Sequence, residues 1–287
     1  MHKAEVIANE IAGAEEKTGH HSAAQLLRGA LHPNGSRVHR NVESTMTVIP
    51  PESFISSALA LIKAETLLPD VVLRPDCRKR LESILAESKY ASRLRAKGIR
   101  RRNKLLFLGP PGCGKSLTAL ALANELGLPH YVVRFDAVIG AYLGQTAIHL
   151  RQLFQFVSNT PCVLLFDEID ALGTQRGNTR DVGELDRIVI ALMQELDLLT
   201  TKGIVIAASN LPEHLDRALA RRFDLIVRFP VPKKMELLQF SKTLAKRFKI
   251  SLSERVIVEL SRVSSFAEAE KSIEDEARRL ALAEFEG

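Results

Sequence analysis

The eight residues GPPGCGKS, Gly109 to Ser116, restrict the fold more than any other stretch of the chain. They fit the pattern G-x-x-x-x-G-K-[ST] of a phosphate-binding loop. The run Lys104 to Leu108 before them, which is apolar from Leu105 on, predicts a buried strand, and Leu117 to Leu126 after them predicts a helix. In that context the glycines turn backbone N–H groups onto a phosphate, and the helix dipole attracts the same anion. A turn rich in Gly and Pro that fits the pattern by chance is the alternative.

The same loop indicates how a nucleoside triphosphate would be held. Lys115 would reach its β- and γ-phosphates, and the hydroxyl of Ser116 would bind Mg²⁺ together with Asp167. The residues expected to contact the nucleotide are Gly109, Pro110, Pro111, Gly112, Cys113, Gly114, Lys115, Ser116, Leu117 and Asp167.

Alternating apolar and amphipathic stretches around the loop predict an α/β fold. Continuous apolar strands are typical of a parallel sheet covered on both faces, so we expect a doubly wound sheet with its site at the carboxyl ends of the strands. The expected strands are Leu105–Leu108, His130–Phe135, Cys162–Phe166, Gly203–Ser209 and Leu225–Phe229. The expected helices are Arg78–Ser88, Gly114–Leu126, Thr146–Ser158, Gly183–Leu199 and Pro212–Arg221.

The remaining segments predict helices without strands. Residues 1–31 form a hairpin of two short amphipathic helices, too small for a core of its own, which we interpret as a docking element for a partner or substrate. Residues 32–67 are a linker. A helix is expected at Ser53–Leu68, and all but its last residue lies in this linker. The α/β domain is expected at 68–230. A small helical domain is expected at 231–287, with helices Lys233–Phe248, Ser253–Val263 and Phe266–Phe285.

The composition is that of an ordinary globular chain of 287 residues, of which 46% are hydrophobic. Its apolar runs are shorter than the roughly 18 residues of a membrane-spanning helix, and its N-terminus lacks the apolar core of a signal peptide. We therefore expect a cytoplasmic protein without membrane contact. Cys77, Cys113 and Cys162 stand singly and without metal-site spacing, so we expect reduced thiols.

The net charge of +6 allows an acidic partner, and cations concentrate in residues 93–104, RLRAKGIRRRNK. One interpretation of this segment is a surface for nucleic acid. The other is a solvated helix end and loop, because cations favour helix C-termini. The segment has no aromatic residue for stacking on bases, which favours the second interpretation.

Two adjacent carboxylates, Asp167 and Glu168, follow the apolar strand Cys162–Phe166. At the carboxyl end of a buried strand they would meet the phosphate loop. Asp167 can then hold Mg²⁺, and Glu168 can polarise the attacking water. Hydrolysis of a phosphoanhydride needs both tasks, one charge for the metal and one for the nucleophile. A helix N-cap is the alternative for a single Asp.

Three motifs in order resemble the AAA+ ATPases, in particular their AAA subgroup. They are GPPGCGKS, then LLFDEID at Leu164–Asp170, then ASNLPEHLDRALARRFD at Ala208–Asp224. The resemblance covers about residues 68 to 284. It implies ATP and Mg²⁺ as ligands, a P-loop NTPase sheet of five strands in the order 5-1-4-3-2, a helical lid, and a ring of identical subunits, usually six.

The resemblance assigns further residues by their position in these motifs. Asn210 matches the polar residue that senses the γ-phosphate and helps to place the water. Arg222 matches the arginine finger, which neutralises transition-state charge at the neighbouring subunit's nucleotide. A second finger would have to be Arg221, because Leu225 stands where many relatives carry another arginine. Capping of a helix C-terminus is the alternative for both arginines.

Residues 140–144, GAYLG, resemble the pore loop with which AAA unfoldases grip a polypeptide. Tyr142 and Leu143 are therefore the expected substrate contacts, with glycines on both sides that allow movement. A tyrosine that anchors a turn is the alternative. Arg187 either matches a subunit-contacting arginine of the family or pairs with Glu184 on one helix face.

Phe266 and Cys113 also depart from the family pattern. Phe266 stands where the lid normally has a glycine that leaves room beside the adenine, which puts base contacts there in doubt. Cys113 stands where Thr is common, and the helix N-terminus beside it would lower the pKa of its thiol. We interpret the Cys113 substitution as harmless, with redox sensitivity as the alternative.

Together these features predict an ATPase that remodels, unfolds or translocates a protein substrate in an oligomeric ring. A separate effector such as a protease would be a partner, since the chain contains no H-E-x-x-H or G-x-S-x-G motif of its own. One alternative is a nucleic-acid motor or loader that uses residues 93–104. The other is a nucleotide-dependent scaffold whose output is assembly.

Overall fold

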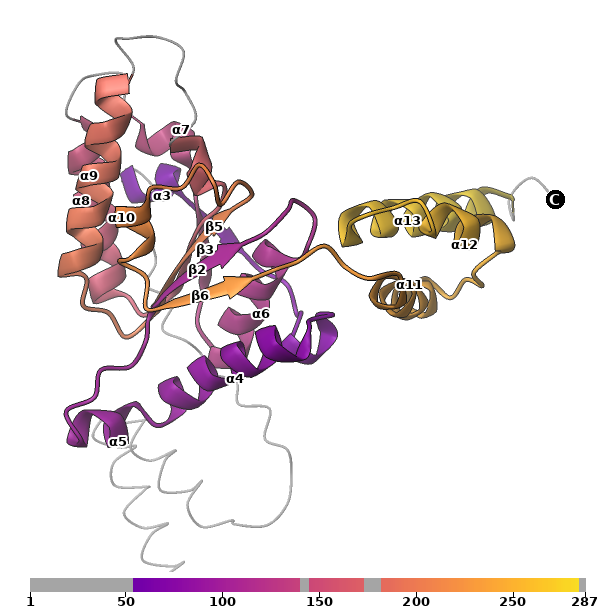
Figure 1. Cartoon of the computed structure of the whole chain (residues 1–287), viewed down its shortest axis with the longest axis horizontal. Helices are drawn as coiled ribbons and strands as arrows, with labels where there is room; N and C mark the ends of the chain where they lie inside the picture. Colours follow the sequence, from indigo (N-terminus) through magenta and orange to yellow (C-terminus); the bar gives the residue numbers. More distant parts are fainter. Residues whose placement is uncertain (1–53, 140–144, 173–181, 284–287) are drawn as a thin grey trace, which may run out of the picture. The chain divides into compact units, whose positions relative to one another are not determined.

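The computed structural model describes residues 54–139, 145–172 and 182–283 (Figure 1). Strands alternate with helices up to Arg228, and the described residues after it form helices. The strands are β1 (Leu59–Ile62), β2 (Lys104–Leu108), β3 (His130–Val133), β4 (Val163–Phe166), β5 (Ile204–Ser209) and β6 (Leu225–Arg228). The helices are α3 (Phe54–Ala58), η1 (Leu68–Asp70), α4 (Pro75–Lys89), α5 (Ala91–Ala96), α6 (Lys115–Leu126), α7 (Phe135–Val138), α8 (Gln145–Asn159), η2 (Ile169–Leu172), α9 (Val182–Leu198), α10 (Arg217–Ala220), α11 (Lys234–Phe248), α12 (Glu254–Leu260) and α13 (Phe266–Ala283).

The six strands form one sheet in the order β1-β3-β4-β5-β2-β6. Strands β2 to β6 are parallel to one another, and β1 is antiparallel to β3. The expectation of five strands was wrong. The order differs from the expected one at the β3 edge, where β1 is added.

Residues 53–68 do not form the single helix that their spacing predicts. Helix α3 ends at Ala58, and β1 then pairs with β3, Leu59 opposite Val133. Without β1, the edge of β3 would present a row of unpaired N–H and C=O groups. Pairing at this edge therefore outweighs the helical spacing of a short apolar segment, and the sheet includes residues that the sequence places in the linker.

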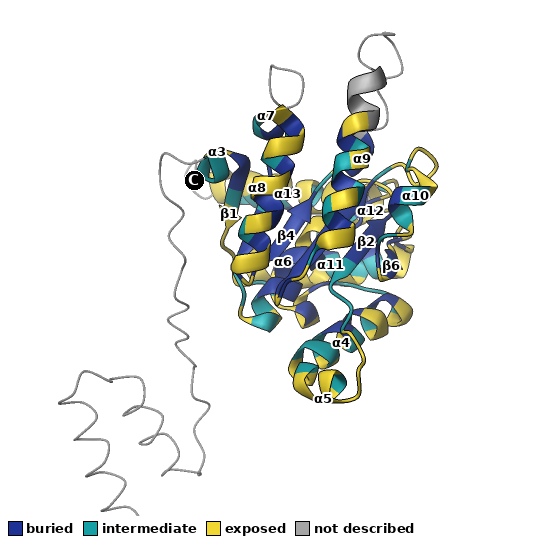
Figure 2. Cartoon of the chain, turned by 90° about the vertical axis from the view of Figure 1, so that its left-hand side faces the viewer, coloured by how far each residue is buried: buried dark blue, intermediate teal, exposed yellow. Residues whose placement is uncertain are grey.

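The core lies on both faces of the sheet, because successive side chains of a strand point to opposite sides. Leu106 and Leu108 of β2 face the side covered by α8 and α9, whereas Leu105 and Phe107 face α4 and α6. All residues of β4 and β5 are buried. Helices α8 and α9 bury the side that faces the sheet and expose the outer side (Figure 2). The α/β class and the largely parallel sheet are therefore confirmed.

Several elements differ from the predicted ones. Strand β3 ends at Val133, because helix α7 begins at Phe135. Helix α10 has only four residues, since the carboxylate of Asp216 accepts the N–H groups of Ala218 and Leu219 and starts the helix there. Helix α5, which follows α4, has no counterpart among the predicted elements.

Helices α11, α12 and α13 pack around a core of their own, made of Leu237, Leu244, Val256, Leu260, Ala269 and Ile273. The first turn of α13 reaches the phosphate loop, where the N–H groups of Phe266 and Ala267 donate to the carbonyl of Gly112 (3.0 and 3.3 Å). Among the helices that the structure describes, none combines the length and the apolar composition of a membrane-spanning segment.

Candidate active site

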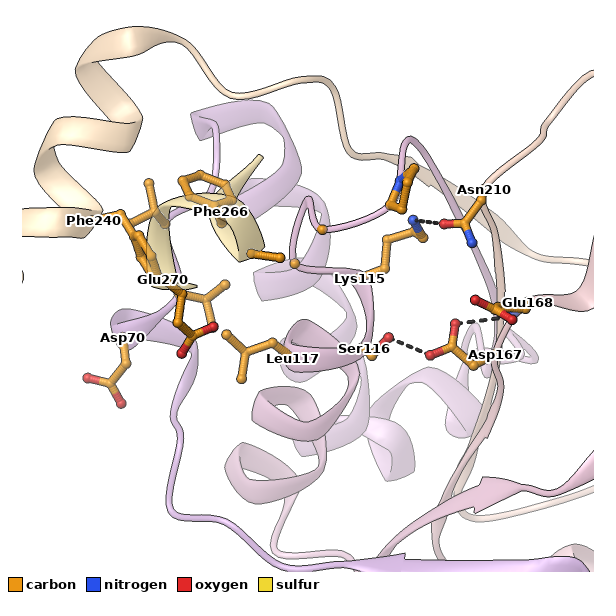
Figure 3. A pocket seen from close by; sticks show the side chains of 16 residues that line it. Asp70, Lys115, Ser116, Leu117, Asp167, Glu168, Asn210, Phe240, Phe266 and Glu270 are labelled. Carbon is orange, nitrogen blue, oxygen red and sulfur yellow. Dashed lines mark hydrogen bonds between the residues drawn. The ribbon is translucent and has the colours of Figure 1, made fainter. Parts of the chain in front are cut away.

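A pocket of about 300 Å³ lies where β2, β4 and β5 end, and it extends to α11 and α13 (Figure 3). Polar groups gather at one end, and the other end is mainly apolar. The polar end is lined by Lys115, Ser116, Asp167, Glu168 and Asn210, together with Pro111, Gly112 and Gly114. The apolar end is lined by Val71, Val72, Leu117, Phe240, Phe266 and Ala267, with the carboxylates of Asp70 and Glu270.

Two glycines of the phosphate loop occupy positions that have no room for a side chain. A Cβ atom on Gly109 would come within 2.0 Å of the carbonyl oxygen of Phe229. Gly112 has a φ of 70°, and a Cβ atom there would press on Ser265 and Ala267 at 3.0 Å. The glycines therefore allow the loop to lie against the end of β6 and the start of α13.

Lys115 begins helix α6 and has 5% of its surface exposed. Its ammonium donates to the carbonyls of Gly109 (2.7 Å) and Pro110 (2.8 Å) and to the side-chain oxygen of Asn210 (2.7 Å). These three bonds use all three of its protons. Burial lowers the pKa of Lys115, and nearby carboxylates oppose that shift. Neutral oxygens thus hold the cation, and an anionic phosphate is a stronger partner that can replace them.

Asp167 and Glu168 follow β4 directly. The hydroxyl of Ser116 donates to one carboxylate oxygen of Asp167 (2.5 Å), and the other oxygen accepts the N–H of Glu168 (3.0 Å). Glu168 has a φ of 53°, a left-handed conformation that costs a residue other than Gly about 1–3 kcal/mol. The strained residue is the one that the sequence assigns to activation of water.

Asn210 follows the last residue of β5, and its side chain points toward Lys115 (Figure 3). Its backbone N–H donates to Asp170 (3.1 Å), a residue with 8% of its surface exposed. The sequence analysis gave Asp170 no role. A signal was present, because Asp170 stands between the apolar residues Ile169 and Ala171, and a carboxylate that is buried among apolar residues needs a partner.

Comparison with known proteins identifies the family. Residues 105–231 match the family model described as ATPase family associated with various cellular activities (AAA). A protein of Sinorhizobium fredii, named uncharacterized AAA family ATPase y4kL, is 35% identical over 265 residues, which cover 92% of this chain and 80% of that protein. The chain belongs to the AAA family of ATPases. It is an ATP-hydrolysing enzyme, and the predicted family is confirmed.

Two further relatives of this AAA ATPase differ in how much they share with it. A protein of Methanothermobacter thermautotrophicus, named as a homologue of a 26S proteasome regulatory subunit, is 30% identical over 269 residues, 91% of this chain and 69% of that protein. The peroxisomal ATPase PEX6 of Candida glabrata is 36% identical over 162 residues. That match spans 54% of this chain and 16% of PEX6, so most of PEX6 has no counterpart here.

The two arginines that follow α10 in this AAA ATPase are absent from the described residues that line its pocket. Arg222 donates through Nη1 to the carbonyl of Ala218 (2.7 Å) and through Nε to Asp197 of α9 (3.4 Å). Its side chain remains 30% exposed, and Arg221 is exposed. Arg222 therefore makes a contact at the end of α10 and is also accessible to another molecule.

Phe266 forms part of the apolar end of the pocket. Its ring packs against Phe240 of α11, with ring centroids 5.2 Å apart and planes tilted by 60°. A base bound at this end would contact aromatic rings. In the family pattern, a glycine at the position of Phe266 leaves space there instead. Phe240 and Glu270 were missed by the sequence analysis, because they belong to no motif and reach the pocket only through packing of α11 and α13.

Several expected contacts of the AAA ATPase fall outside the part of the chain that the structure describes. Tyr142 and Leu143, the expected substrate contacts, are among them, as are the hairpin at 1–31 and the side chain of Glu184. Arg187 is described and lies exposed on α9.

Two arginines of the basic segment 93–104 make contacts within the fold. Arg101 donates to the carbonyls of Thr201 (3.4 Å) and Gly203 (2.8 Å), and Arg102 forms an ion pair with Glu87. The cations at 93, 95, 97 and 100 are exposed, and two of them lie in the last turn of α5. This arrangement supports a solvated helix end and loop rather than a continuous cationic surface.

Cys113 is buried in the phosphate loop, with 4% of its surface exposed. Burial raises the pKa of its thiol, and the neighbouring Lys115 opposes that shift only in part. The expectation of a lowered pKa at the helix N-terminus was therefore wrong, because desolvation outweighs the positive charges. A protonated, buried thiol is a poor nucleophile, which supports the interpretation of Cys113 as a harmless substitution.

Proposed function

We propose that this AAA ATPase binds ATP with its phosphates on the loop at 109–116 and its base at the apolar end of the pocket. The observation that carries the proposal is the contact of Ser116 with Asp167, because it joins the two halves of a hydrolytic site. Lys115 and the backbone N–H groups at the start of α6 bind the phosphates. The base then lies against Phe240 and Phe266.

The residues at the polar end suit Mg²⁺. Ser116 and Asp167 provide a hydroxyl and a carboxylate, the oxygen ligands that this ion prefers. Their oxygen atoms are 2.5 Å apart, so one ion can replace the hydrogen bond between them. When bound, Mg²⁺ neutralises negative charge that develops on the β- and γ-phosphates.

Glu168 is proposed to accept the proton of the attacking water. Asn210 holds that water and the γ-phosphate in place through its side-chain amide. Lys115, which uses neutral oxygens in the described structure, transfers its hydrogen bonds to the phosphates. A positioned general base contributes typically about 10²–10⁴-fold to a rate, so Glu168 is the residue on which hydrolysis depends most directly.

We propose that Arg222 completes the site of a neighbouring subunit. It does not line the described pocket of its own chain, and its guanidinium is partly exposed. An arginine finger supplied by another chain is worth about 10³–10⁵-fold in related phosphoryl transfers. The enzyme therefore acts as a homo-oligomeric ring, with six subunits as in the family that its motifs resemble. Arg221 is the candidate for a second finger.

The work that hydrolysis drives is proposed to be remodelling of a protein substrate. Support comes from the sequence GAYLG at 140–144 and from a relative named for a proteasome regulatory subunit. Tyr142 and Leu143 would grip the substrate, residues 1–31 would recruit it or an effector protein, and residues 231–287 would act as a lid on the nucleotide domain, which includes β1 (Leu59–Ile62). A nucleic-acid motor is less well supported, because Arg101 and Arg102 are used within the fold.

The nucleotide part of the proposal is tested with Lys115→Ala and Glu168→Gln. Lys115→Ala should lose affinity for ATP with Mg²⁺, measured by calorimetry. Glu168→Gln should keep that affinity and lose phosphate release by about 10²–10⁴-fold, because only the base is removed. Glu213→Gln, at an exposed position outside the pocket, is the matched control. Hydrolysis at the unmodified rate by either site variant would refute the assignment.

The remodelling part is tested with Tyr142→Ala. We expect basal ATP hydrolysis to stay unchanged while stimulation by an unfolded protein, fluorescently labelled casein, disappears. Tyr142→Phe should retain the stimulation, because its ring is intact. Equal loss of basal and stimulated hydrolysis would indicate a structural tyrosine. Stimulation by DNA with a steep dependence on salt would instead favour the nucleic-acid alternative.

A further inference from the structure

A buried carboxylate outside the proposed phosphate, metal and water contacts connects two parts of the site. Asp170 lies in η2, three residues after Asp167, and accepts the backbone N–H of Asn210 (3.1 Å). The side chain of Asn210 accepts the ammonium of Lys115 (2.7 Å). Asn210 therefore connects η2 to the phosphate loop through two hydrogen bonds, one from its backbone N–H and one to its side-chain oxygen.

The backbone of Asn210 lies just beyond the sheet. Pairing of β5 with β2 ends at Ser209, opposite Leu108, so the N–H of Asn210 takes no part in that ladder. The next residues, Leu211 to His214, are exposed. The carboxylate of Asp170 thus holds a backbone position at the point where strand becomes exposed loop.

Burial strengthens this contact. Asp170 has 8% of its surface exposed, and Asn210 is half-buried. Hydrogen bonds to a carboxylate are about twice as strong as neutral ones, and a low local dielectric increases that strength. Removal of the acceptor would leave a poorly hydrated N–H group without its partner, which a native structure tolerates rarely.

The hydrogen bonds of Lys115 explain why Asn210 needs a contact that holds its backbone. In the described structure its three protons go to Gly109, Pro110 and Asn210. When phosphates take over the ammonium, the amide of Asn210 loses this partner and must be held in place through its backbone. The backbone contact with Asp170 does not involve Lys115 and can persist through that exchange.

We infer that Asp170 is a positioning residue, which anchors the backbone of Asn210 and thereby keeps its amide at the reacting phosphate. The inference rests on the proposed function, because it concerns the residue that would place the γ-phosphate and water. Asp170 is absent from the described residues that line the pocket, so we expect it to act through Asn210.

A double-mutant cycle tests this assignment on the full-length enzyme. Asp170→Ala and Asp170→Ser should each lower kcat by about ten- to a hundredfold, the loss expected of one charge-assisted hydrogen bond. The KM for ATP should stay within about twofold, because the phosphate loop is unchanged. In an Asn210→Ala background, either change should cause no further loss of kcat, since the side chain to be positioned is gone.

Two controls separate positioning from general stability. Asp170→Asn retains an acceptor oxygen and should keep kcat near that of the unmodified enzyme. Glu87→Ala also removes a carboxylate that accepts a backbone N–H, that of Arg102 (2.9 Å), but outside the pocket. It should lower Tm and show no coupling with Asn210→Ala.

Three results would overturn the inference. One is that Asp170→Ser lowers kcat by the same factor in the unmodified enzyme and in the Asn210→Ala variant. This result counts against the inference even if Asn210→Ala alone leaves kcat unchanged. Another is an unchanged kcat in both the Ala and Ser variants. The third is failure of every Asp170 variant to fold, Asn included, which would make the role structural. Failure of the proposed function would be seen separately, as hydrolysis retained by Lys115→Ala.

Discussion

Phe266 gives the nucleotide pocket of this AAA ATPase an aromatic wall. Its backbone is tied to Gly112 of the phosphate loop, and its ring packs on Phe240. Phe266 therefore both forms the aromatic end of the pocket and connects it to the phosphate loop. Stacking on an aromatic ring depends little on the identity of the base, so we expect the pocket to accept nucleoside triphosphates other than ATP.

Replacement of Phe266 by Leu should weaken the binding of ATP by about five- to a hundredfold, since base stacking contributes about 1–3 kcal/mol. Binding of inorganic tripolyphosphate should not change, because this probe has no base. Calorimetry with both probes measures the difference.

The matched controls for Phe266 are an aromatic replacement and a distant phenylalanine. Phe266→Tyr should bind ATP normally. Phe248→Leu, at the exposed last residue of α11, should do the same. Tighter binding of ATP by Phe266→Gly would show that the ring obstructs the base instead of stacking on it.

Helix α10 is a short element that ends just before the proposed arginine finger. It has four residues, and Asp216 caps it by accepting the N–H groups of Ala218 and Leu219 (2.5 and 3.4 Å). The helix ends at the arginines, where Arg222 donates back to Ala218. The orientation of Arg222 therefore depends on the cap at the other end of the same turn.

Asp216→Ala should destabilise this turn by about 0.5–2 kcal/mol, the usual effect of a lost N-cap. We expect lower ATP hydrolysis at a protein concentration that permits assembly, and unchanged affinity for ATP, since Asp216 does not line the pocket. Rates of phosphate release and calorimetry check both. Asp216→Asn retains a capping oxygen and should behave like the unmodified enzyme. A loss of ATP affinity in Asp216→Ala would contradict this separation.

The proposal of a shared active site concerns the assembled molecule, and mixing two inactive variants tests it. Glu168→Gln lacks the base but keeps Arg222, and Arg222→Ala lacks the finger but keeps the base. If the finger acts between subunits, an equal mixture should recover about a quarter of the unmodified activity. At about a quarter of the interfaces, a subunit that keeps Glu168 then receives Arg222 from a neighbour that keeps it. Phosphate release measured before and after mixing checks this. An arginine that acts within its own chain would give no recovery.

Stability of the whole fold should depend on pH through His130. This residue has 3% of its surface exposed, and its Nδ1 has no hydrogen-bond partner among the described residues. Burial lowers its pKa below the usual 6.5, and a hydrogen bond with the backbone of Val163 opposes that shift. Below pH 6.5 the unfolded chain therefore binds a proton that the folded chain does not, so the free energy of unfolding decreases as the pH falls and is unaffected above that pH.

The expected slope is at most about 1.4 kcal/mol per pH unit, the limit for one proton. Urea unfolding between pH 5 and 7 measures it, in a window above the titration of most carboxylates. His130→Gln should flatten the slope. His149→Gln, at a half-buried ring stacked on Phe54, is the control and should leave it unchanged. Equal slopes in the two variants would rule out His130 as the cause.

Which polar residues meet in the candidate site was predictable, because they belong to short contiguous segments. A loop that wraps a phosphate needs its glycines, Lys115 and Ser116 at fixed spacing, and a pair of acids after a buried strand places Asp167 and Glu168 beside it. Five alternating strands were also predictable, since β2 to β6 are apolar runs with helices between them.

The remaining features depend on residues that are distant in the sequence. Strand β1 exists because the edge of β3, some 70 residues later, offers it hydrogen bonds, which no local pattern records. Asp170 accepts a hydrogen bond from Asn210, forty positions away in the sequence. Phe266 donates one to Gly112 of the phosphate loop, more than 150 positions before it. Local spacing determines which groups can do chemistry here, whereas long-range pairing and burial decide which residues hold those groups in place.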